Sequence, residues 1–84
     1  MRHLASPAFW DSYQKLPGTA RELADKSFAL LKSDPRHPSL HFKKVSSYWS
    51  LRVGLRYRAL GVEQDGNIVW FWIGSHADYD AKIR

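Results

Sequence analysis

The sequence contains no cysteine and no long apolar run. The absence of cysteine excludes disulfide bridges and thiolate zinc sites, so stability has to come from a hydrophobic core. No apolar stretch approaches the roughly 18 residues that a membrane-spanning helix needs. The opening residues, MRHLASP, also lack the apolar run of a secretory signal. We therefore expect a cytoplasmic protein with no membrane partner.

Acidic residues are scarce as well. Lysine and arginine total 13 against 8 aspartate and glutamate, a formal net charge of +5. No acidic residue lies between Asp34 and Glu63, whereas this segment carries eight basic side chains: Arg36, His37, His41, Lys43, Lys44, Arg52, Arg56 and Arg58. A block of one charge on ordered structure favours an anion-binding surface, with nucleic acid as a natural partner. A solvated surface that happens to be basic is the alternative.

The apolar content is enough for one hydrophobic core. Of the 84 residues, 44% are hydrophobic, and tryptophan, tyrosine and phenylalanine occur four times each. A chain of this size buries one core and not two. We therefore expect residues 1–84 to form a single domain, and we assign all four tryptophans to its core: Trp10, Trp49, Trp70 and Trp72.

The first part of the chain has the spacing of two helices. Ser6 followed by Pro7 is a typical helix start, and apolar residues then recur at helical intervals as far as Leu16, before Pro17 and Gly18. A capping-box spacing, Thr19 with Glu22, begins a second helix from about Thr19 to Lys32. Asp34-Pro35 ends it, because the residue before proline is pushed out of the helical region. The pattern predicts a helical hairpin.

From Leu40 onward the apolar period changes to two. One half-buried strand is predicted up to Val53, with a break at Gly54 and a second strand beginning near Arg56. Asp65-Gly66 is a tight-turn signal, and residues 67–73 (NIVWFWI) form a third strand that is apolar on both faces. Such a strand belongs in the middle of a sheet. The end of the chain is predicted as a loop, with one helical turn from Asp78.

Together these elements predict an α+β fold in which the N-terminal helical hairpin packs on a small, mainly antiparallel sheet. The sequence does not determine how the two strands on either side of Gly54 pair with each other. A three-residue turn would place Arg52 and Arg58 opposite each other on one face, where they repel unless an anion lies between them. A two-residue turn would point them to opposite faces.

The order of the predicted helices and strands and several local motifs resemble the RelE/ParE superfamily of bacterial toxins. Two helices precede three strands, residues 48–53 (YWSLRV) are similar to the aromatic-Trp-Ser-x-Arg strand of YoeB-like members, and residues 56–60 (RYRAL) match the next strand with its arginine. Residues 73–79 (IGSHADY) resemble the family's ending, in which a basic residue and a tyrosine follow a glycine. The resemblance covers nearly the whole chain.

This resemblance implies a two-layer RelE-like fold and the toxin of a type II toxin-antitoxin system, held inactive by a cognate antitoxin. RelE-like members cut mRNA on or near the ribosome without metal, so we expect an endoribonuclease that needs no cofactor. ParE-like members instead inhibit DNA gyrase without enzymatic activity, and an inactive module that only binds antitoxin is a third reading. The fold alone does not separate these functions.

Carried over to this sequence, the resemblance indicates a catalytic set and a binding set. Arg58 would stabilise the reacting phosphate, and His76 would act as general acid or base from a loop after the central strand. Tyr79 would stack on a base or contact phosphate, although packing against the sheet explains it equally well. The RNA backbone would be held by Lys43, Lys44, Arg52 and Arg56.

The sequence departs from the YoeB-like pattern at the general base. Those members carry a glutamate ahead of the aromatic-Trp-Ser strand, whereas residues 38–41 (PSLH) contain no carboxylate. His76 or His41 must then supply the base, or the activity is weak or absent. Metal binding is not expected, because the spacing of His37, His41 and His76 fits no known ligand pattern.

Overall fold

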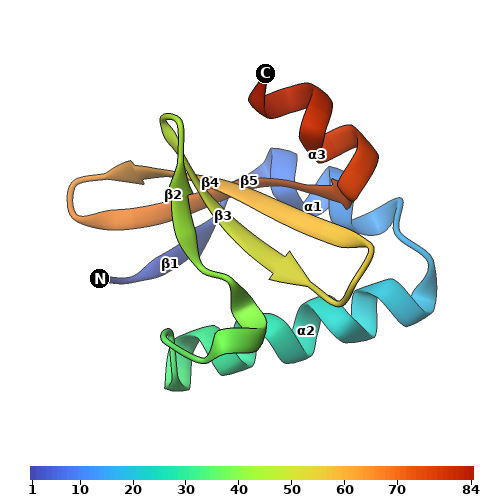
Figure 1. Ribbon diagram of the computed structural model, residues 1–84, viewed down its shortest axis with the longest axis horizontal. Helices are drawn as coiled ribbons and strands as arrows, with labels where there is room; N and C mark the ends of the chain where they lie inside the picture. The colour runs from blue at the N-terminus through green and yellow to red at the C-terminus, as the bar shows by residue number, and fades with distance from the viewer.

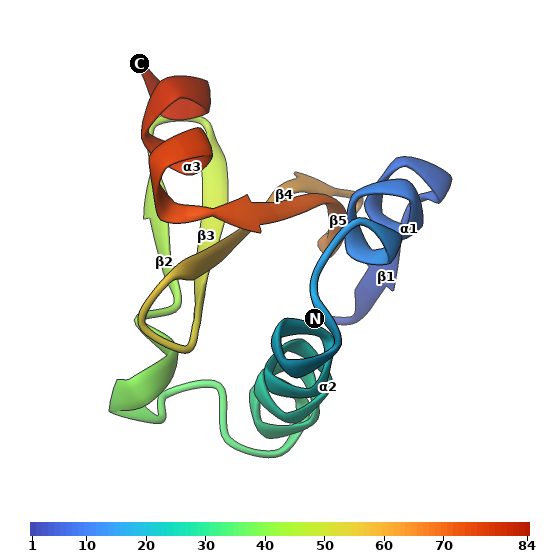
Figure 2. The same cartoon turned by 90° about the vertical axis from the view of Figure 1, so that its right-hand side faces the viewer.

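The computed structural model describes residues 1–84, which form a mixed α+β fold with helices on both faces of one sheet (Figure 2). The strands are β1 (His3–Ala5), β2 (Lys43–Val45), β3 (Tyr48–Val53), β4 (Tyr57–Gln64) and β5 (Asn67–Ser75). The helices are α1 (Pro7–Gln14), α2 (Gly18–Ser33) and α3 (His76–Ile83), with a short 3-10 turn η1 (Pro38–Leu40) before β2 (Figure 1). No helix combines the length and the apolar character that crossing a membrane requires.

The sheet has five strands in the order β1-β5-β4-β3-β2. Strands β2 to β5 pair antiparallel, whereas β1 pairs parallel to β5. The expectation of a helical hairpin on a mainly antiparallel sheet is therefore right in part. Both helices form, but a strand precedes them and makes the sheet mixed. A three-residue edge strand has too short a pattern to be read from sequence.

Helices α1 and α2 cover one face of the sheet, and α3 lies on the other face (Figure 2). The core sits between the sheet and the first two helices. Phe9, Leu16 and Leu31 from the helices pack there with Leu51 and Trp70 from the strands. Leu60 is also fully buried, but alternation along β4 turns it toward α3. The sheet thus has one fully covered face and one face that a single short helix covers in part.

The turn between β4 and β5 has the local chemistry that the sequence indicates. Asp65 and Gly66 connect β4 to β5 with φ values of 54° and 79°, the left-handed pair that a two-residue hairpin needs. Strand β5 has neighbours on both sides, as its apolar character predicts. Its partner β4 carries a β-bulge at Leu60/Gly61.

Three sequence-based predictions are wrong. The segment from Leu40 to Val53 is not one strand, because a turn at Ser46 and Ser47 divides it into the hairpin of β2 and β3, with Ser46 at φ 58°. The C-terminal segment forms the eight-residue helix α3 and not a loop with one turn. Trp10 is 50% exposed, and Trp72 is half-buried on the sheet face that carries α3, so neither belongs to the core, whereas Trp70 is 1% exposed and Trp49 packs against the core.

His3 ties the edge strand to the core. Its Nδ1 accepts a hydrogen bond from Trp70 Nε1 at 3.1 Å, and its ring packs against Trp70 and Phe42. Burial, followed by the positive charges of Lys32 and the amino terminus, lowers the pKa of His3 below its ordinary value.

This lowered pKa predicts a dependence of stability on pH. The unfolded chain binds a proton on His3 more readily than the folded protein, so folding stability falls as the pH drops below the unfolded pKa of about 6.5 and through the folded value. His3→Gln should show a shallower loss of the free energy of unfolding between pH 7 and pH 5, measured by urea denaturation. Equal losses in the two proteins would show that His3 is not responsible.

Candidate functional site

The register between β3 and β4 places two arginines side by side. Arg52 pairs directly with Arg58, and Val53 pairs with Tyr57, so the turn has three residues and begins at Gly54. Gly54 adopts a φ of 62°, a conformation that suits glycine. The structure therefore decides the open register in favour of the arrangement in which both guanidinium groups share one face.

Neither arginine has a carboxylate partner. The only ion pair in the structure joins His76 Nε2 to Asp80 Oδ1 at 3.4 Å. Arg58 donates to the Tyr57 carbonyl at 2.7 Å, and Arg52 Nε donates to the Gly54 carbonyl at 3.2 Å. Partial burial, and then the charge of Arg52, lowers the pKa of Arg58, with Tyr79 and Asp80 acting in the opposite direction. The pair is thus a positive site that a bound anion would stabilise.

Lys43 and Lys44 separate to opposite faces of the sheet. Directly paired residues of antiparallel strands point to the same side. Lys43 pairs with Ser50, which shares its face with Arg52, whereas Lys44 pairs with Trp49 on the core side. Of the two lysines, only Lys43 extends the basic surface of the arginine pair. Arg56 lies exposed in the turn after Gly54.

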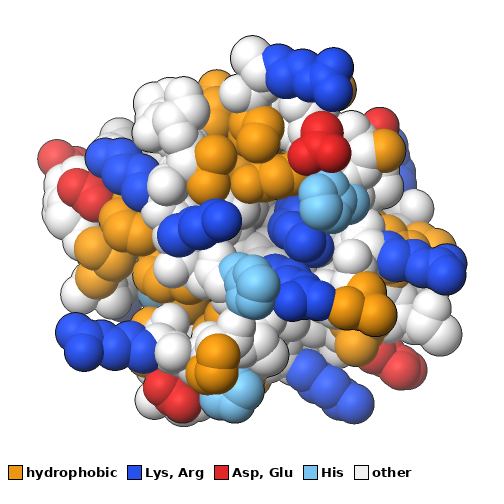
Figure 3. Space-filling model, viewed as in Figure 1, with side chains coloured by type: hydrophobic (Ala, Val, Ile, Leu, Met, Phe, Trp, Pro, Cys, Tyr) orange, Lys and Arg blue, Asp and Glu red, His pale blue; other side chains and the backbone are white.

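Two histidines flank the arginines from outside the β3-β4 hairpin. His41 follows η1, and its Nε2 lies 3.2 Å from Arg52 Nη1. The backbone N–H of His76 donates a hydrogen bond of 2.8 Å to the Arg56 carbonyl, which fixes His76 next to the β3-β4 turn. In the view onto this face, histidine side chains lie on either side of lysine and arginine side chains around a central hollow (Figure 3).

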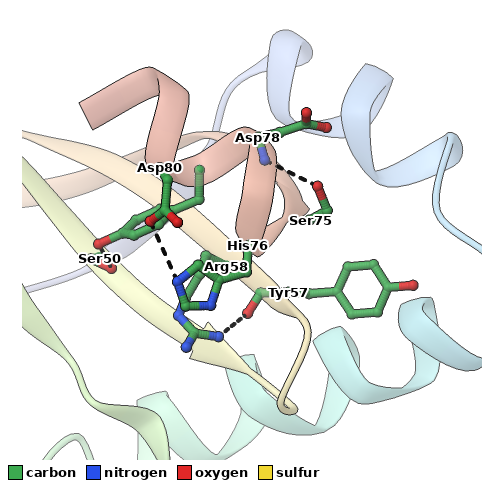
Figure 4. Close-up of polar contacts among 8 residues, drawn as sticks. Ser50, Tyr57, Arg58, Ser75, His76, Asp78 and Asp80 are labelled. Carbon is green, nitrogen blue, oxygen red and sulfur yellow. Dashed lines mark hydrogen bonds and ion pairs between the residues drawn. The ribbon is translucent and has the colours of Figure 1, made fainter. Parts of the chain in front are cut away.

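His76 begins α3, which corrects the prediction that it lies on a loop. Ser75 caps this helix, its Oγ accepting from the Asp78 backbone N–H at 3.1 Å. Because α3 starts immediately after β5, the imidazole stands beside Arg58, with Asp80 one helical turn further on (Figure 4). The i,i+4 spacing of His76 and Asp80 is present in the sequence, but it has meaning only once this segment is known to be a helix.

Tyr79 is buried under α3, with 6% of its surface exposed. Its hydroxyl accepts a hydrogen bond at 2.9 Å from Ser50 Oγ, whose residue is 3% exposed. Its ring meets the His76 ring edge-on at a centroid distance of 5.8 Å. This placement favours the packing role of Tyr79 over base stacking, since a stacking ring has to be accessible.

No three histidine, aspartate or glutamate side chains lie together as a set of metal ligands. What the face does bring together is permanent positive charge, two accessible imidazoles and a buried serine-tyrosine pair. Fold and site thus define a small basic α+β protein with one face on which positive charge is concentrated.

Comparison with known families gives this class a name. The model of the ParE-like toxin domain matches residues 20–81, so the chain belongs to that family and to the RelE/ParE superfamily of toxins. The superfamily membership predicted from the sequence is confirmed. No curated protein sequence matches the chain significantly.

Solved structures share the fold at low sequence identity. The RelB-RelE antitoxin-toxin complex from Methanococcus jannaschii gives a TM-score of 0.72 at 16% identity, covering 96% of this chain and 99% of that one. The YoeB/ParE toxin from Agrobacterium tumefaciens gives 0.66 at 18% identity, with 90% and 99% covered. The isolated E. coli RelE toxin gives 0.62 at 15% identity, with 96% and 94% covered.

The arginine pair, which forms no ion pair with a carboxylate, predicts stabilisation of the protein by inorganic phosphate. Added phosphate should raise the melting temperature of the protein more than chloride at equal ionic strength, because it binds the folded state. Arg52→Met and Arg58→Met should lose most of this shift. Arg36→Met removes an exposed arginine away from the pair and serves as control; an equal shift in all four proteins would mean nonspecific screening.

The buried Ser50-Tyr79 hydrogen bond predicts a coupled effect on stability. Tyr79→Phe should lower the free energy of unfolding by about 1–3 kcal/mol, because the Ser50 hydroxyl loses its partner. Ser50→Ala in the same chain should recover part of this loss, since removing both partners is close to neutral. Urea denaturation of the two single variants and the double variant measures the coupling, and purely additive losses would contradict it.

Proposed function

We propose that this chain is the toxin of a toxin-antitoxin system and acts as a metal-independent endoribonuclease on mRNA, on or near the ribosome in the cytoplasm. The single observation that carries the proposal is the Arg52–Arg58 pair, in which both arginines share one face, neither forms an ion pair with a carboxylate, and histidines lie beside them. RNA cleavage through the 2′-hydroxyl needs this combination: a cation for the crowded phosphate, a base for the 2′-hydroxyl and an acid for the leaving oxygen.

In this proposal the arginines act on the phosphate. A guanidinium can hold two phosphate oxygens at once, and Arg58 is partly buried beside α3, where charge interactions are less screened than at the surface. Arg52 and Lys43 extend the same face and hold the flanking backbone. Arg56 and Lys44 contribute net charge without being directed at the reacting phosphate.

An antitoxin is the proposed protein partner. An apolar groove of about 580 Å³ lies between β1, α1 and α2 on the side away from the arginines. Two of its lining residues leave large apolar side chains in solvent, Trp10 at 50% and Leu4 at 45% exposure. A bound antitoxin segment would cover this surface. Several structures that share the fold are toxin complexes with antitoxins.

Lys43 and Lys44 are neighbours in the chain that point to opposite faces of the sheet, so alanine variants of the two give a matched test of the RNA face. Induced in a bacterium, the wild-type chain should arrest growth and fragment mRNA, and Arg58→Ala should reduce the cleavage rate about 100-fold, the usual effect of removing one group that stabilises transition-state charge. Lys43→Ala should weaken RNA binding and reduce its salt dependence by about one phosphate contact, whereas Lys44→Ala should not. Growth assays, cut-site mapping and RNA-binding titrations measure these effects.

Other outcomes of this test identify other functions. Growth arrest with intact RNA would point to the gyrase inhibition of ParE-like toxins. Unharmed growth with a folded protein would point to an inactive antitoxin-binding module. Equal effects of Lys43→Ala and Lys44→Ala would show that binding depends on net charge and not on the face that the register defines.

A further inference from the structure

We infer that a second copy of this chain docks in the apolar groove between β1, α1 and α2, and that the two copies form a symmetric dimer through antiparallel α2 helices. The groove opens beside α1 and α2, on the other side of the molecule from β2, β3 and α3, so the dimer leaves the basic face free (Figure 2). The observation that carries the inference is that the α2 wall of the groove is complementary to itself in charge.

This wall is a single stripe of α2. Four residues of the helix line the groove: Asp25, Phe28, Ala29 and Lys32. Positions i, i+3, i+4 and i+7 lie on one face of a helix, so the stripe has a negative end, an apolar middle and a positive end. Its charged ends are two turns apart, which is about 10 Å along the axis. Neither Asp25 nor Lys32 forms an ion pair within its own chain.

A twofold axis between Phe28 and Ala29 pairs the two stripes. With the helices antiparallel, Asp25 of one copy faces Lys32 of the other, and the symmetry repeats this contact, so that two ion pairs form. A parallel arrangement would instead place each charge against its own equivalent and repel. Ala29 is exposed and small, which allows the two helix axes to approach to about 8 Å. The charges of the stripe therefore select one orientation and one register.

Apolar side chains beside the stripe supply the burial that drives association. Trp10 is 50% exposed and Leu4 is 45% exposed at the rim of the groove. The Trp10 ring meets the rings of Phe9 and Tyr13 edge-on, at centroid distances of 5.2 Å and 5.3 Å, so its position is fixed before binding. Tryptophan is among the residues that most often dominate the energy of an interface. A second copy would remove this apolar surface from water.

The charge balance of the groove distinguishes a second copy from other partners. Apart from His3, whose pKa is lowered chiefly by burial, the lining carries one acidic and one basic side chain. A partner of a single charge sign, such as RNA, gains nothing from this lining. A fitting partner needs both signs about 10 Å apart with apolar groups between them, and α2 is itself such a segment.

The dimer would cover, in the free protein, the surface proposed above for an antitoxin. The second copy and the antitoxin would therefore exclude each other. This exclusion rests on the proposed function, whereas the dimer itself does not.

Reversal of the two charges tests the dimer. Sedimentation of the full chain over a concentration series should give a dimer with a dissociation constant of about 100 µM or lower. Asp25→Lys and Lys32→Glu each replace both ion pairs by like charges, so each should weaken the dimer about 10-fold or more. The double variant Asp25→Lys/Lys32→Glu restores opposite charges and should dimerise within about 3-fold of the wild type.

Mixing the single variants gives an independent measurement. One copy carrying Asp25→Lys and one carrying Lys32→Glu form two opposite-charge contacts, so the mixed dimer should be tighter than either variant alone. Lys26→Glu makes the same charge change on α2 outside the groove lining and should leave the dissociation constant unchanged. Trp10→Ala should weaken the dimer about 10-fold.

Melting temperatures show whether each variant is folded. Asp25→Lys also removes the acceptor of the 2.7 Å hydrogen bond from the Tyr13 hydroxyl. The double variant lacks this bond as well, so a restored dimer cannot be attributed to it.

Three results would overturn the inference. A wild-type chain that stays monomeric up to about 100 µM would leave the groove to an antitoxin alone. A dimer unchanged in both single variants would place the interface elsewhere, and a double variant as weak as the single ones would show that Asp25 and Lys32 do not face each other. All three leave the ribonuclease proposal standing. Unharmed growth with a dimer that follows the expected pattern would instead remove the proposed function and keep the dimer.

Discussion

The direct pairing of Arg52 with Arg58 is the constraint on which the functional face depends. Two like charges on neighbouring strands destabilise a sheet unless something compensates for them. Neither arginine forms an ion pair with a carboxylate, Asp80 offsets the charge of Arg52 at Arg58 only from beyond ion-pair distance, and the partial burial of Arg58 increases the cost. An anion bound between the two guanidinium groups would relieve this electrostatic cost.

Helix α3 completes the site. Because α3 begins immediately after β5, it places His76 beside the arginines. The same helix buries Tyr79 between itself and the sheet, where the Tyr79 hydroxyl meets Ser50. The hydrogen bond between the two hydroxyls anchors the helix on a sheet face that is otherwise open. The exposed His76 and the buried Tyr79 therefore lie within one helical turn, and a helix this short depends on the sheet for its position.

The sequence predicts the elements whose signals are local. The spacing of apolar residues indicates both N-terminal helices, Asp65-Gly66 indicates a tight turn, and the run from residue 67 to 73 indicates a central strand. Superfamily membership follows from the order of the motifs. The edge strand β1 and the division of β2 from β3 at Ser46 escape prediction, because a three-residue strand and a serine turn have no distinctive local pattern.

By itself the sequence determined the fold class, the basic segment without carboxylates and the candidate residues Arg58 and His76. Only the tertiary structure decided which of these residues act together. One residue more or less in the turn at Gly54 would send Arg52 and Arg58 to opposite faces, and the same two-residue period separates Lys43 from Lys44. The contact between His41 and Arg52 joins segments 11 residues apart. Register and packing, which depend on the whole sheet, are what assemble the site.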